Sequence, residues 1–239
     1  MSNKRSHRIR KILFGQSAIS LLILFIAGIL IFYSQGFRVN FKTFKFYKTS
    51  VLVLESNPKP DQVFINGKEQ AVKSSFAINI TPGDYNVSVS KAGYQDWSIY
   101  LHAESEKLYD FKDVELFLSV PQVSELTEQS KIDYLNSPDS VLAENAAEDL
   151  NFNNYEIWIG NKLVTRFSDP ISGVKWFPDM KHVIFCKSNA IWSVEDSGSN
   201  ITKLFDYDSG TQIKFAVGGQ GKEIYYYDGN KYFRVRIKD

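Results

Sequence analysis

Cysteine and histidine are scarce in this chain, and their scarcity excludes several kinds of site. Cys186 is the one cysteine, so no intrachain disulfide can form. The three histidines, His7, His102 and His182, stand far apart, without the spacing that a structural zinc site needs. The net charge is only +1, so bulk attraction for a phosphate backbone is missing. We expect no metal, no cofactor and no nucleic-acid partner.

Motifs of catalysis are missing as well. The sequence has no serine, histidine and acid constellation, no phosphate-cradling glycine loop and no carboxylate pair in a plausible cleft. Asp206 and Asp208 alternate as in a calcium loop, but Val217 stands where the bidentate glutamate belongs, which favours a turn. Cys186 follows apolar residues without an evident histidine partner, which favours a core thiol. We expect no catalytic residue and no enzyme.

Acidic residues are absent before Glu55, and charge of either sign is absent from residues 12–33. About 20 apolar residues suffice for a helix to cross a membrane, so we expect a transmembrane helix over 12–33. The run ends in bulky residues instead of a small-x-small site, so we expect it to be retained. The basic tail 1–11 is expected in the cytoplasm and residues 34–239 outside. This predicts a single-pass cell-membrane protein with the lipid bilayer as a partner.

The stretch after this run, residues 34–48, interleaves basic and aromatic side chains and is expected to be a stalk. One interpretation is an interfacial strip whose cations contact anionic lipid or wall polymer. The other is a short solvated stalk whose aromatics pack on the next domain. The candidate interaction residues here are Arg38, Lys42, Lys45 and Lys48.

Short alternating segments begin at Thr49 and predict an all-β domain over 49–119. Asn66-Gly67 is a strong hairpin signal. In ITPGDYNVSVSKAGYQ, Tyr85, Val87 and Val89 alternate with polar residues between two turn sequences. Each strand therefore has one apolar and one polar face, as in a small antiparallel sandwich.

The stretches SNPKPDQVFINGK and ITPGDYNVSVSKAGYQDW resemble the PEGA domain. The resemblance covers roughly residues 50–118 and implies a small β-sandwich of prokaryotic envelope and surface-layer proteins. It also implies adhesion or scaffolding and brings no catalytic residue. The segment that names the family reads Pro58-Lys59-Pro60-Asp61 here, so only its first proline is kept.

A repeat of about 40 residues follows a polar linker over 120–130. Pro138-Asp139 recurs as Pro178-Asp179, and VKWFPDMKHVIFCKSNAIWSV resembles a blade of a TolB-type propeller. Phe177 replaces the serine of the usual motif, and Met180 replaces its glycine. Residues 131–239 are therefore expected to form about three blades of a partial β-propeller. Self-association, docking on the sandwich or a partner, and truncation of a longer relative all remain open.

Aromatic residues supply the last candidates. Tyr225, Tyr226 and Tyr227 lie consecutively on one predicted strand, so one of its two faces is expected to offer a binding patch. The blade tryptophans are interpreted as core residues, with sugar stacking as the alternative; they are Trp158, Trp176 and Trp192.

The fold class that emerges is mainly β: a transmembrane helix, a PEGA-like sandwich and about three propeller-like blades. We expect a non-catalytic, membrane-anchored extracytoplasmic binding or scaffolding protein of the prokaryotic cell envelope. Expected partners are envelope proteins, wall polymer or a second copy that joins open propeller edges. The alternative is a ligand-binding or sensor subunit of an envelope enzyme or transport complex. These functions rest on resemblance of fold rather than on a site.

Overall fold

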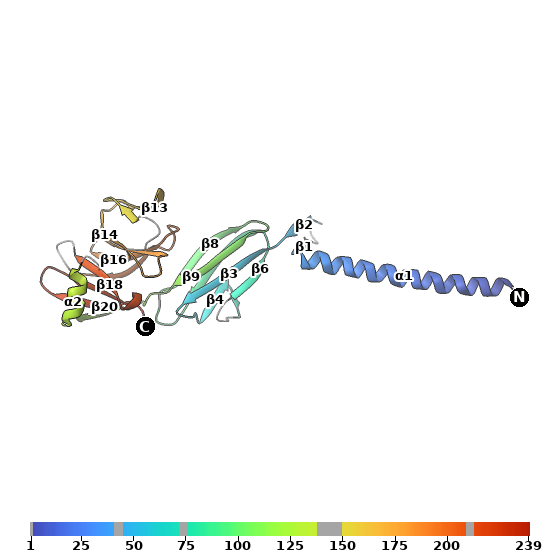
Figure 1. Cartoon of the computed structure of the whole chain (residues 1–239), viewed down its shortest axis with the longest axis horizontal. Coiled ribbons are helices and arrows are strands. Elements are labelled where there is room, and N and C mark those ends of the chain that lie inside the picture. Colours follow the sequence, from blue (N-terminus) through green and yellow to red (C-terminus); the bar gives the residue numbers. More distant parts are fainter. Residues whose placement is uncertain (1, 41–44, 72–75, 138–149, 209–212) are drawn as a thin grey trace. The chain divides into compact units, whose positions relative to one another are not determined.

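Strands predominate over helices in this protein, as the sequence predicts. The computed structural model, drawn in Figure 1, describes residues 2–40, 45–71, 76–137, 150–208 and 213–239. Within these ranges the structure is mainly β, and its six sheets contain two to four strands each.

The chain divides into two compact units. The first comprises residues 1–53, 77–84 and 102–110. The second, which holds most of the strands, comprises residues 54–76, 85–101 and 111–239.

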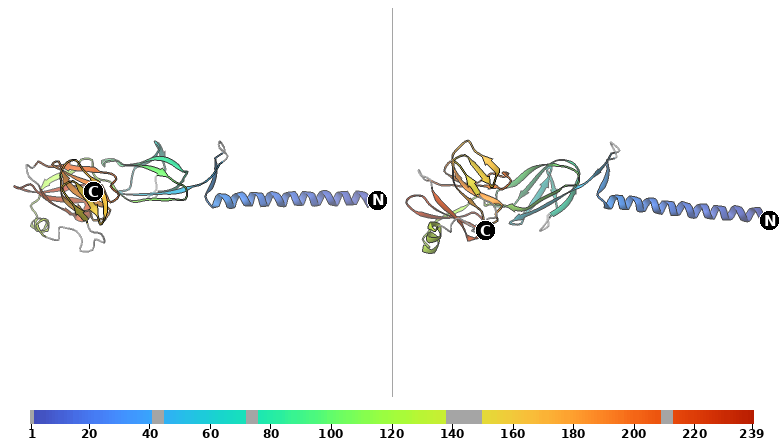
Figure 2. Two further views of the ribbon diagram at one scale, coloured as in Figure 1. Left: turned by 90° about the horizontal axis from the view of Figure 1, so that it is seen from above. Right: turned by 45° about the horizontal axis from the view of Figure 1, so that its top comes forward.

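The first unit begins with α1 (Ser2–Ser34), which is one unbroken helix in every view (Figures 1 and 2). Among the described residues, no helix combines the length and the apolar character that crossing a membrane requires. This finding contradicts the predicted single-pass membrane protein with a cytoplasmic tail and extracytoplasmic domains. The helix starts in a basic segment, and Gln16, Ser17 and Ser20 interrupt its apolar part. The apolar side chains of residues 19–31 are largely exposed, and no described residue is seen to cover them.

In the predicted stalk, β1 (Phe37–Asn40) pairs antiparallel with β2 (Lys45–Lys48). The ring of Phe32, near the end of α1, stacks on Phe37 with centroids 4.3 Å apart and meets Phe46 edge-on at 5.4 Å. Phe37 and Phe46 therefore pack on the end of the preceding helix.

Seven strands occupy residues 50–115 and form two sheets, ordered β6-β3-β9 and β5-β4-β7-β8. They confirm the all-β character that the alternating segments predict. The bounds are β3 (Ser50–Asn57), β4 (Gln62–Ile65), β5 (Lys68–Gln70), β6 (Phe76–Ile80), β7 (Gly83–Ser90), β8 (Trp97–Ala103) and β9 (Leu108–Glu115).

The turn between β4 and β5 follows directly from the predicted hairpin sequence. Ile65 pairs with Lys68, which leaves Asn66 and Gly67 as a two-residue loop. Both have positive φ, 51° and 73°, which is the geometry that an Asn-Gly turn provides. The Asn66 side chain also accepts a hydrogen bond from the backbone N–H of Asn86 at 2.7 Å, so it ties the turn to β7.

The alternation in β7 has the predicted consequence. Val87 and Val89 are fully buried, whereas Asn86, which precedes Val87 on the same strand, is exposed. Gly93 in the following turn has φ of +81°, which supports the reversal that leads to β8. The pattern that the sequence shows is therefore a core face and a wet face.

The remaining strands form three sheets in the second unit. Their orders are β11-β12-β13, β14-β15-β16-β17 and β10-β20-β19-β18. The bounds are β10 (Gln122–Glu125), β11 (Leu150–Phe152), β12 (Glu156–Ile159), β13 (Lys162–Arg166), β14 (Ile171–Trp176), β15 (His182–Lys187), β16 (Ala190–Glu195), β17 (Thr202–Asp206), β18 (Lys214–Gly218), β19 (Glu223–Tyr227) and β20 (Tyr232–Arg236).

The sheet that contains β15 is the middle layer of the three. On one face of β15, Ile184 and Cys186 join a core with residues of β18, β19 and β20. On the other face, Val183 and Phe185 join a second core with residues of β12 and β13. The middle sheet is therefore buried on both faces, whereas strands of residues 50–115 such as β3 and β7 have one buried face and one more exposed face. Within the described residues no sheet returns to its first strand, so neither a closed barrel nor a closed propeller is seen.

The predicted linker 120–130 turns out to be structured. It contains β10, which pairs with β20 through Gln122↔Arg236 to Glu125↔Phe233, and the start of α2 (Gln129–Asn136). Leu126 extends this pairing, because its N–H donates to the Tyr232 carbonyl at 2.8 Å. A segment more than 100 positions upstream of β20 thus completes the last sheet, and α2 covers that sheet through Leu135 and its neighbours.

Candidate interaction sites

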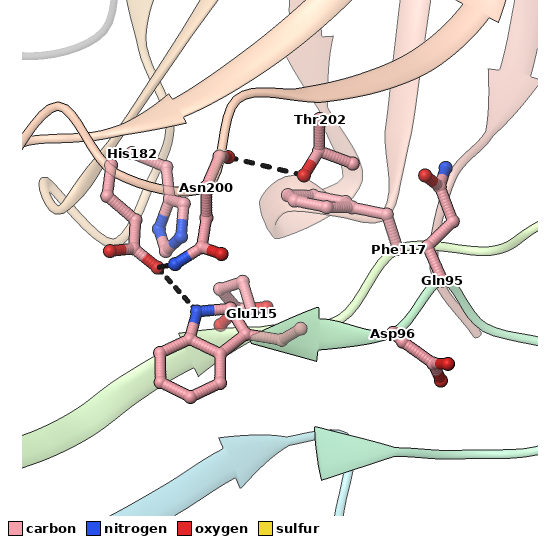
Figure 3. A pocket seen from close by; sticks show the side chains of 9 residues that line it. Gln95, Asp96, Glu115, Phe117, His182, Asn200 and Thr202 are labelled. Atoms are coloured by element: carbon pink, nitrogen blue, oxygen red, sulfur yellow. Dashed lines mark hydrogen bonds between the residues drawn. The ribbon is translucent and has the colours of Figure 1, made fainter. Parts of the chain in front are cut away.

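The β7–β8 turn is joined to the C-terminal sheets by a polar cluster, all of it within the second unit (Figure 3). Trp97 begins β8, and its indole N–H donates to Glu195 Oε1 at 2.6 Å. Asn200 donates to the same carboxylate oxygen at 2.9 Å. Gln95 donates to the Lys203 carbonyl at 2.9 Å. The side chains from these two parts of the chain therefore satisfy one another.

A buried ion pair lies beside this cluster. Lys238 pairs with Glu115 at the end of β9, and the two side chains are only 8% and 10% exposed. Burial lowers the pKa of the Lys238 ammonium to about 8, so the charged form is costly there. The carboxylate of Glu115 offsets that cost, and it also accepts a hydrogen bond from Asn57 at 3.1 Å.

The cluster leaves almost no room for a ligand. The space between its side chains is about 10 Å³, which is room for roughly one water molecule. Phe117 fills the remainder and packs edge-on against Phe177 and His182, with centroids 5.8 Å and 6.2 Å apart. The cluster, which we call the joint, is therefore a packed connection rather than a pocket.

His182 and Asp179 show what the Pro-Asp motif of the repeat does. His182 is buried, and its Nδ1 lies 2.6 Å from Asp179 Oδ2. The other carboxylate oxygen accepts the backbone N–H groups of Lys181 and His182. Burial by itself raises the pKa of Asp179, but these hydrogen bonds and the His182 charge outweigh it and hold the pKa below its ordinary value. The motif is thus a turn with a fixed carboxylate.

An open cavity of about 420 Å³ lies where α2 meets β18 and β19. We call it the Tyr134 cavity; it is lined by Ser130, Lys131, Tyr134, Pro178, Val217, Gly218, Gly219, Gln220 and Tyr225.

Two tyrosine rings form its apolar wall. Tyr134 and Tyr225 meet edge to face with centroids 6.4 Å apart. The Tyr134 hydroxyl donates to the Val217 carbonyl at 2.9 Å, and the Tyr225 hydroxyl donates to Glu223 at 2.7 Å. Burial raises the pKa of both hydroxyls, and Glu223 raises that of Tyr225 further. Both hydroxyls are therefore engaged and neutral.

Glycine brings bare backbone to the same cavity. A Cβ on Gly218 would lie only 2.2 Å from the Tyr225 ring, so the ring occupies the space that a side chain would need. Gly219 and Gln220 follow with positive φ in η2 (Gly219–Gly221) and are exposed. Lys131 lies at the rim, 3.1 Å from Glu128 and 3.6 Å from Glu223. The cavity thus combines apolar walls with a charged rim.

The predicted tyrosine patch is distributed over two faces. Tyr225 is 3% exposed under α2, and Tyr226 is 6% exposed in the opposite core, where it stacks on Phe233 at 4.9 Å. Tyr227 is partly exposed and donates to the Gly229 carbonyl at 2.8 Å. The three side chains are therefore not presented together, and Tyr225 is the one that lines a cavity.

The predicted basic residues near β1 and β2 have partners within the first unit. Arg38 donates to the Tyr33 and Phe37 carbonyls and lies 4.3 Å from the centre of the Tyr33 ring. Lys48 pairs with Glu106. Lys42 and the side chain of Lys45 lie outside the described residues.

The other single residues behave as core or turn groups. Cys186 is buried, which raises the pKa of its thiol to about 12, so it remains protonated and unreactive near neutral pH. Trp176 is buried, whereas Trp158 and Trp192 are partly buried. Asp206 pairs with Lys203 at 2.8 Å, and residues 209–212 of the proposed calcium-like turn lie outside the described residues. In the described part of the chain, His, Cys, Asp and Glu side chains do not gather in the number that a metal ion needs.

Sequence reasoning missed both the Tyr134 cavity and the joint. The local signal for α2 is weak. Its N-cap residue, Glu128, makes no capping hydrogen bond with its side chain, and Leu135 is the one fully buried residue of the helix. The spacing of Ile132 and Leu135 is the one trace of a helical face. Trp97 and Glu195 lie nearly 100 positions apart, and no local pattern links them.

Comparison with protein families identifies one known domain in this chain. Residues 49–112 match the PEGA domain. The match runs from the start of β3 into β9 and confirms the domain that the turn sequences predict. The comparison with curated proteins gave no match. The chain thus contains a PEGA domain, and the described residues after it form three further β-sheets.

Proposed function

We propose that this protein is a non-catalytic binding protein and that the Tyr134 cavity recognises an apolar side chain of a protein partner. The carrying observation is the make-up of that cavity. Tyrosine is enriched at protein interfaces because its rigid ring offers a large contact area, and apolar centres with polar rims are typical of such surfaces. Tyr134 and Tyr225 form the apolar part here, and Lys131 with Gln220 forms the rim.

The chemistry of the cavity favours recognition over reaction. A general base needs a pKa near the working pH, whereas burial raises the pKa of Tyr225 far above it. The ammonium of Lys131 lies near two carboxylates and 5.6 Å from the Tyr225 ring centre, which positions it as a rim charge. A partner that buries its own apolar group in the cavity against these rings gains the hydrophobic contribution without disturbing these pairs.

The joint supports the same proposal. The Glu195 carboxylate accepts hydrogen bonds from the Trp97 indole and from Asn200, so this carboxylate connects two parts of the second unit. We propose that this arrangement makes the unit a scaffold for the cavity.

We further propose that the three C-terminal sheets are blades of a partial propeller. The sheet of β14 to β17 is a meander of four consecutive strands. The last sheet has three consecutive strands and receives β10 at its outer side, as in propellers in which an early strand completes the final blade. This support is topological, and a second copy that adds to an open edge is the alternative way of completing the set.

The test of binding uses a photo-crosslinking probe attached to one thiol. Because Cys186 is buried and protonated, a Gln220→Cys variant of the full chain presents one reactive thiol at the cavity rim. The matched control is Ser98→Cys, an exposed position on β8. We expect the rim probe to capture at least one protein five-fold more strongly than the control probe. Ser130→Trp, which places a bulky ring at the cavity, should abolish that difference.

Equal capture from both positions would refute the Tyr134 cavity as the recognition surface. Capture that survives Ser130→Trp would do the same, because the partner would then contact the rim but not the cavity.

A further inference from the structure

A second cavity lies between β14 and β18, which are edge strands of two different sheets. Its volume is about 330 Å³. We call it the Lys175 cavity; it is lined by Gly173, Lys175, Ile213, Lys214 and Phe215. Each of these edge strands pairs with its own sheet on one side only.

The ammonium of Lys175 is held in a defined place. It lies 5.6 Å from the centre of the Phe215 ring, and Phe215 is itself almost fully buried. Burial lowers the pKa of Lys175, and the nearby positive charge of Lys214 lowers it further. Two ammonium groups therefore repel each other across one partly desolvated space.

A β-bulge gives β14 its shape at this point. The pairing with β15 shifts register between Ser172 and Lys175. Gly173 within the bulge has φ of +58°, and a Cβ there would lie 2.9 Å from a carbon of the Phe215 ring. Bulges change the direction of side chains and often lie at functional positions. This bulge directly precedes Lys175 on β14.

Lys214 is the second lysine of this cavity. Its ammonium lies 3.4 Å and 3.5 Å from the backbone and side-chain oxygens of Asn136, which are long contacts to neutral groups. These contacts position the side chain at the end of α2. Two lysines from two different sheets thus line the cavity.

We propose that the Lys175 cavity binds a compact oxyanion of the phosphate type, either free or as a phosphate ester. Such a group carries a charge near −2, which matches two ammonium groups, and its oxygens accept several hydrogen bonds at once. Binding relieves the repulsion between Lys175 and Lys214. The proposal is independent of the Tyr134 cavity, because the two cavities share no lining residue.

The test is calorimetric titration of the full chain with inorganic phosphate and, separately, with glycerol 3-phosphate, at constant ionic strength set by chloride. Lys175→Met and Lys214→Met should each weaken binding at least ten-fold. Lys175→Met replaces a half-buried ammonium with an apolar side chain, so we expect it to fold, which circular dichroism checks. Lys203→Met is the matched control, because Lys203 is an exposed lysine paired with Asp206.

Tighter binding of one ligand than the other identifies the free ion or the ester as the source, and both results support the site. The absence of any heat beyond the chloride control in the unmodified chain would overturn it. Equal affinity in Lys175→Met and the unmodified chain would overturn it too. Ser130→Trp should bind phosphate normally, so failure of the Tyr134 cavity and failure of this site are distinguishable.

Discussion

Several tight turns of this protein contain residues with positive φ, and the type of residue decides how much conformational free energy each turn costs. In the β4–β5 turn, Asn66 and Gly67 suit positive φ well. In the β15–β16 turn, Ser188 and Asn189 have φ of 52° and 56°, although serine is less suited to that conformation. Met180 stands with φ of 57° where the propeller motif has glycine. The last two turns thus keep positive φ although their residues are not the glycines that would predict it from the sequence.

Gly67→Ala isolates this effect. A Cβ at position 67 would meet nothing within 4 Å, so the substitution changes only the backbone preference. We expect the free energy of unfolding to fall by about 1 kcal/mol, because alanine disfavours positive φ. Urea denaturation measures it. Gly67→Asn is the control and should lose less, since asparagine tolerates this conformation; an equal loss in both variants would argue against the backbone explanation.

At the scale of elements, β10 shows that one short strand connects distant parts of the second unit. Its four residues pair with β20, and its outer side is an edge of the sheet. Antiparallel pairs alternate between hydrogen-bonded and non-hydrogen-bonded positions. Since the Leu126 N–H donates to Tyr232, the Ser124 N–H faces β20 and the Val123 N–H faces away.

Ser124→Pro should therefore destabilise the last sheet, whereas Val123→Pro should be tolerated. Proline removes a ladder hydrogen bond only where the N–H faces the partner strand. We expect a loss of about 2 kcal/mol for Ser124→Pro and less than half of that for Val123→Pro, from denaturation followed by tryptophan fluorescence. Ser124→Ala accounts for the weak contact of its hydroxyl with Arg234. Similar losses in both proline variants would mean that β10 contributes little through its pairing.

At the scale of the whole molecule, the joint and the ion pair beside it connect distant parts of the second unit. The buried Glu115–Lys238 pair links the end of β9 with the C-terminal end of the chain. Gln95 and Trp97 add hydrogen bonds to the middle sheet, to the Lys203 carbonyl and to the Glu195 carboxylate respectively. A buried ion pair contributes less to stability than its Coulomb attraction suggests, but removal of one partner is costly because the other charge stays buried.

Glu115→Gln should lower the free energy of unfolding by about 3 kcal/mol, because it leaves the Lys238 ammonium buried beside a neutral amide. The double variant Glu115→Leu with Lys238→Met should recover most of that loss, since it removes both charges. Thermal and urea denaturation of the single and double variants measure the coupling. If the free energy of unfolding of Glu115→Gln lay within about 0.5 kcal/mol of the parent value, as for an ordinary surface substitution, water would be screening the pair.

Local sequence determined the parts of this protein that depend on neighbours along the chain. Asn66-Gly67 specified its hairpin, and the alternation of Val87 and Val89 specified which face of β7 is buried, because side chains in a strand alternate with a period of two. The same local signals carried the resemblance to the PEGA domain.

The tertiary structure decided what depends on residues far apart. Only folding brings β10 to β20, Glu115 to Lys238, and Lys175 to Lys214. It also buries both faces of β15 and hides Tyr225 under α2, because adjacent layers cover surfaces that look exposed in a single strand. Pairing across more than 100 positions leaves no local period in the sequence, so both cavities and the joint became visible only in the folded chain.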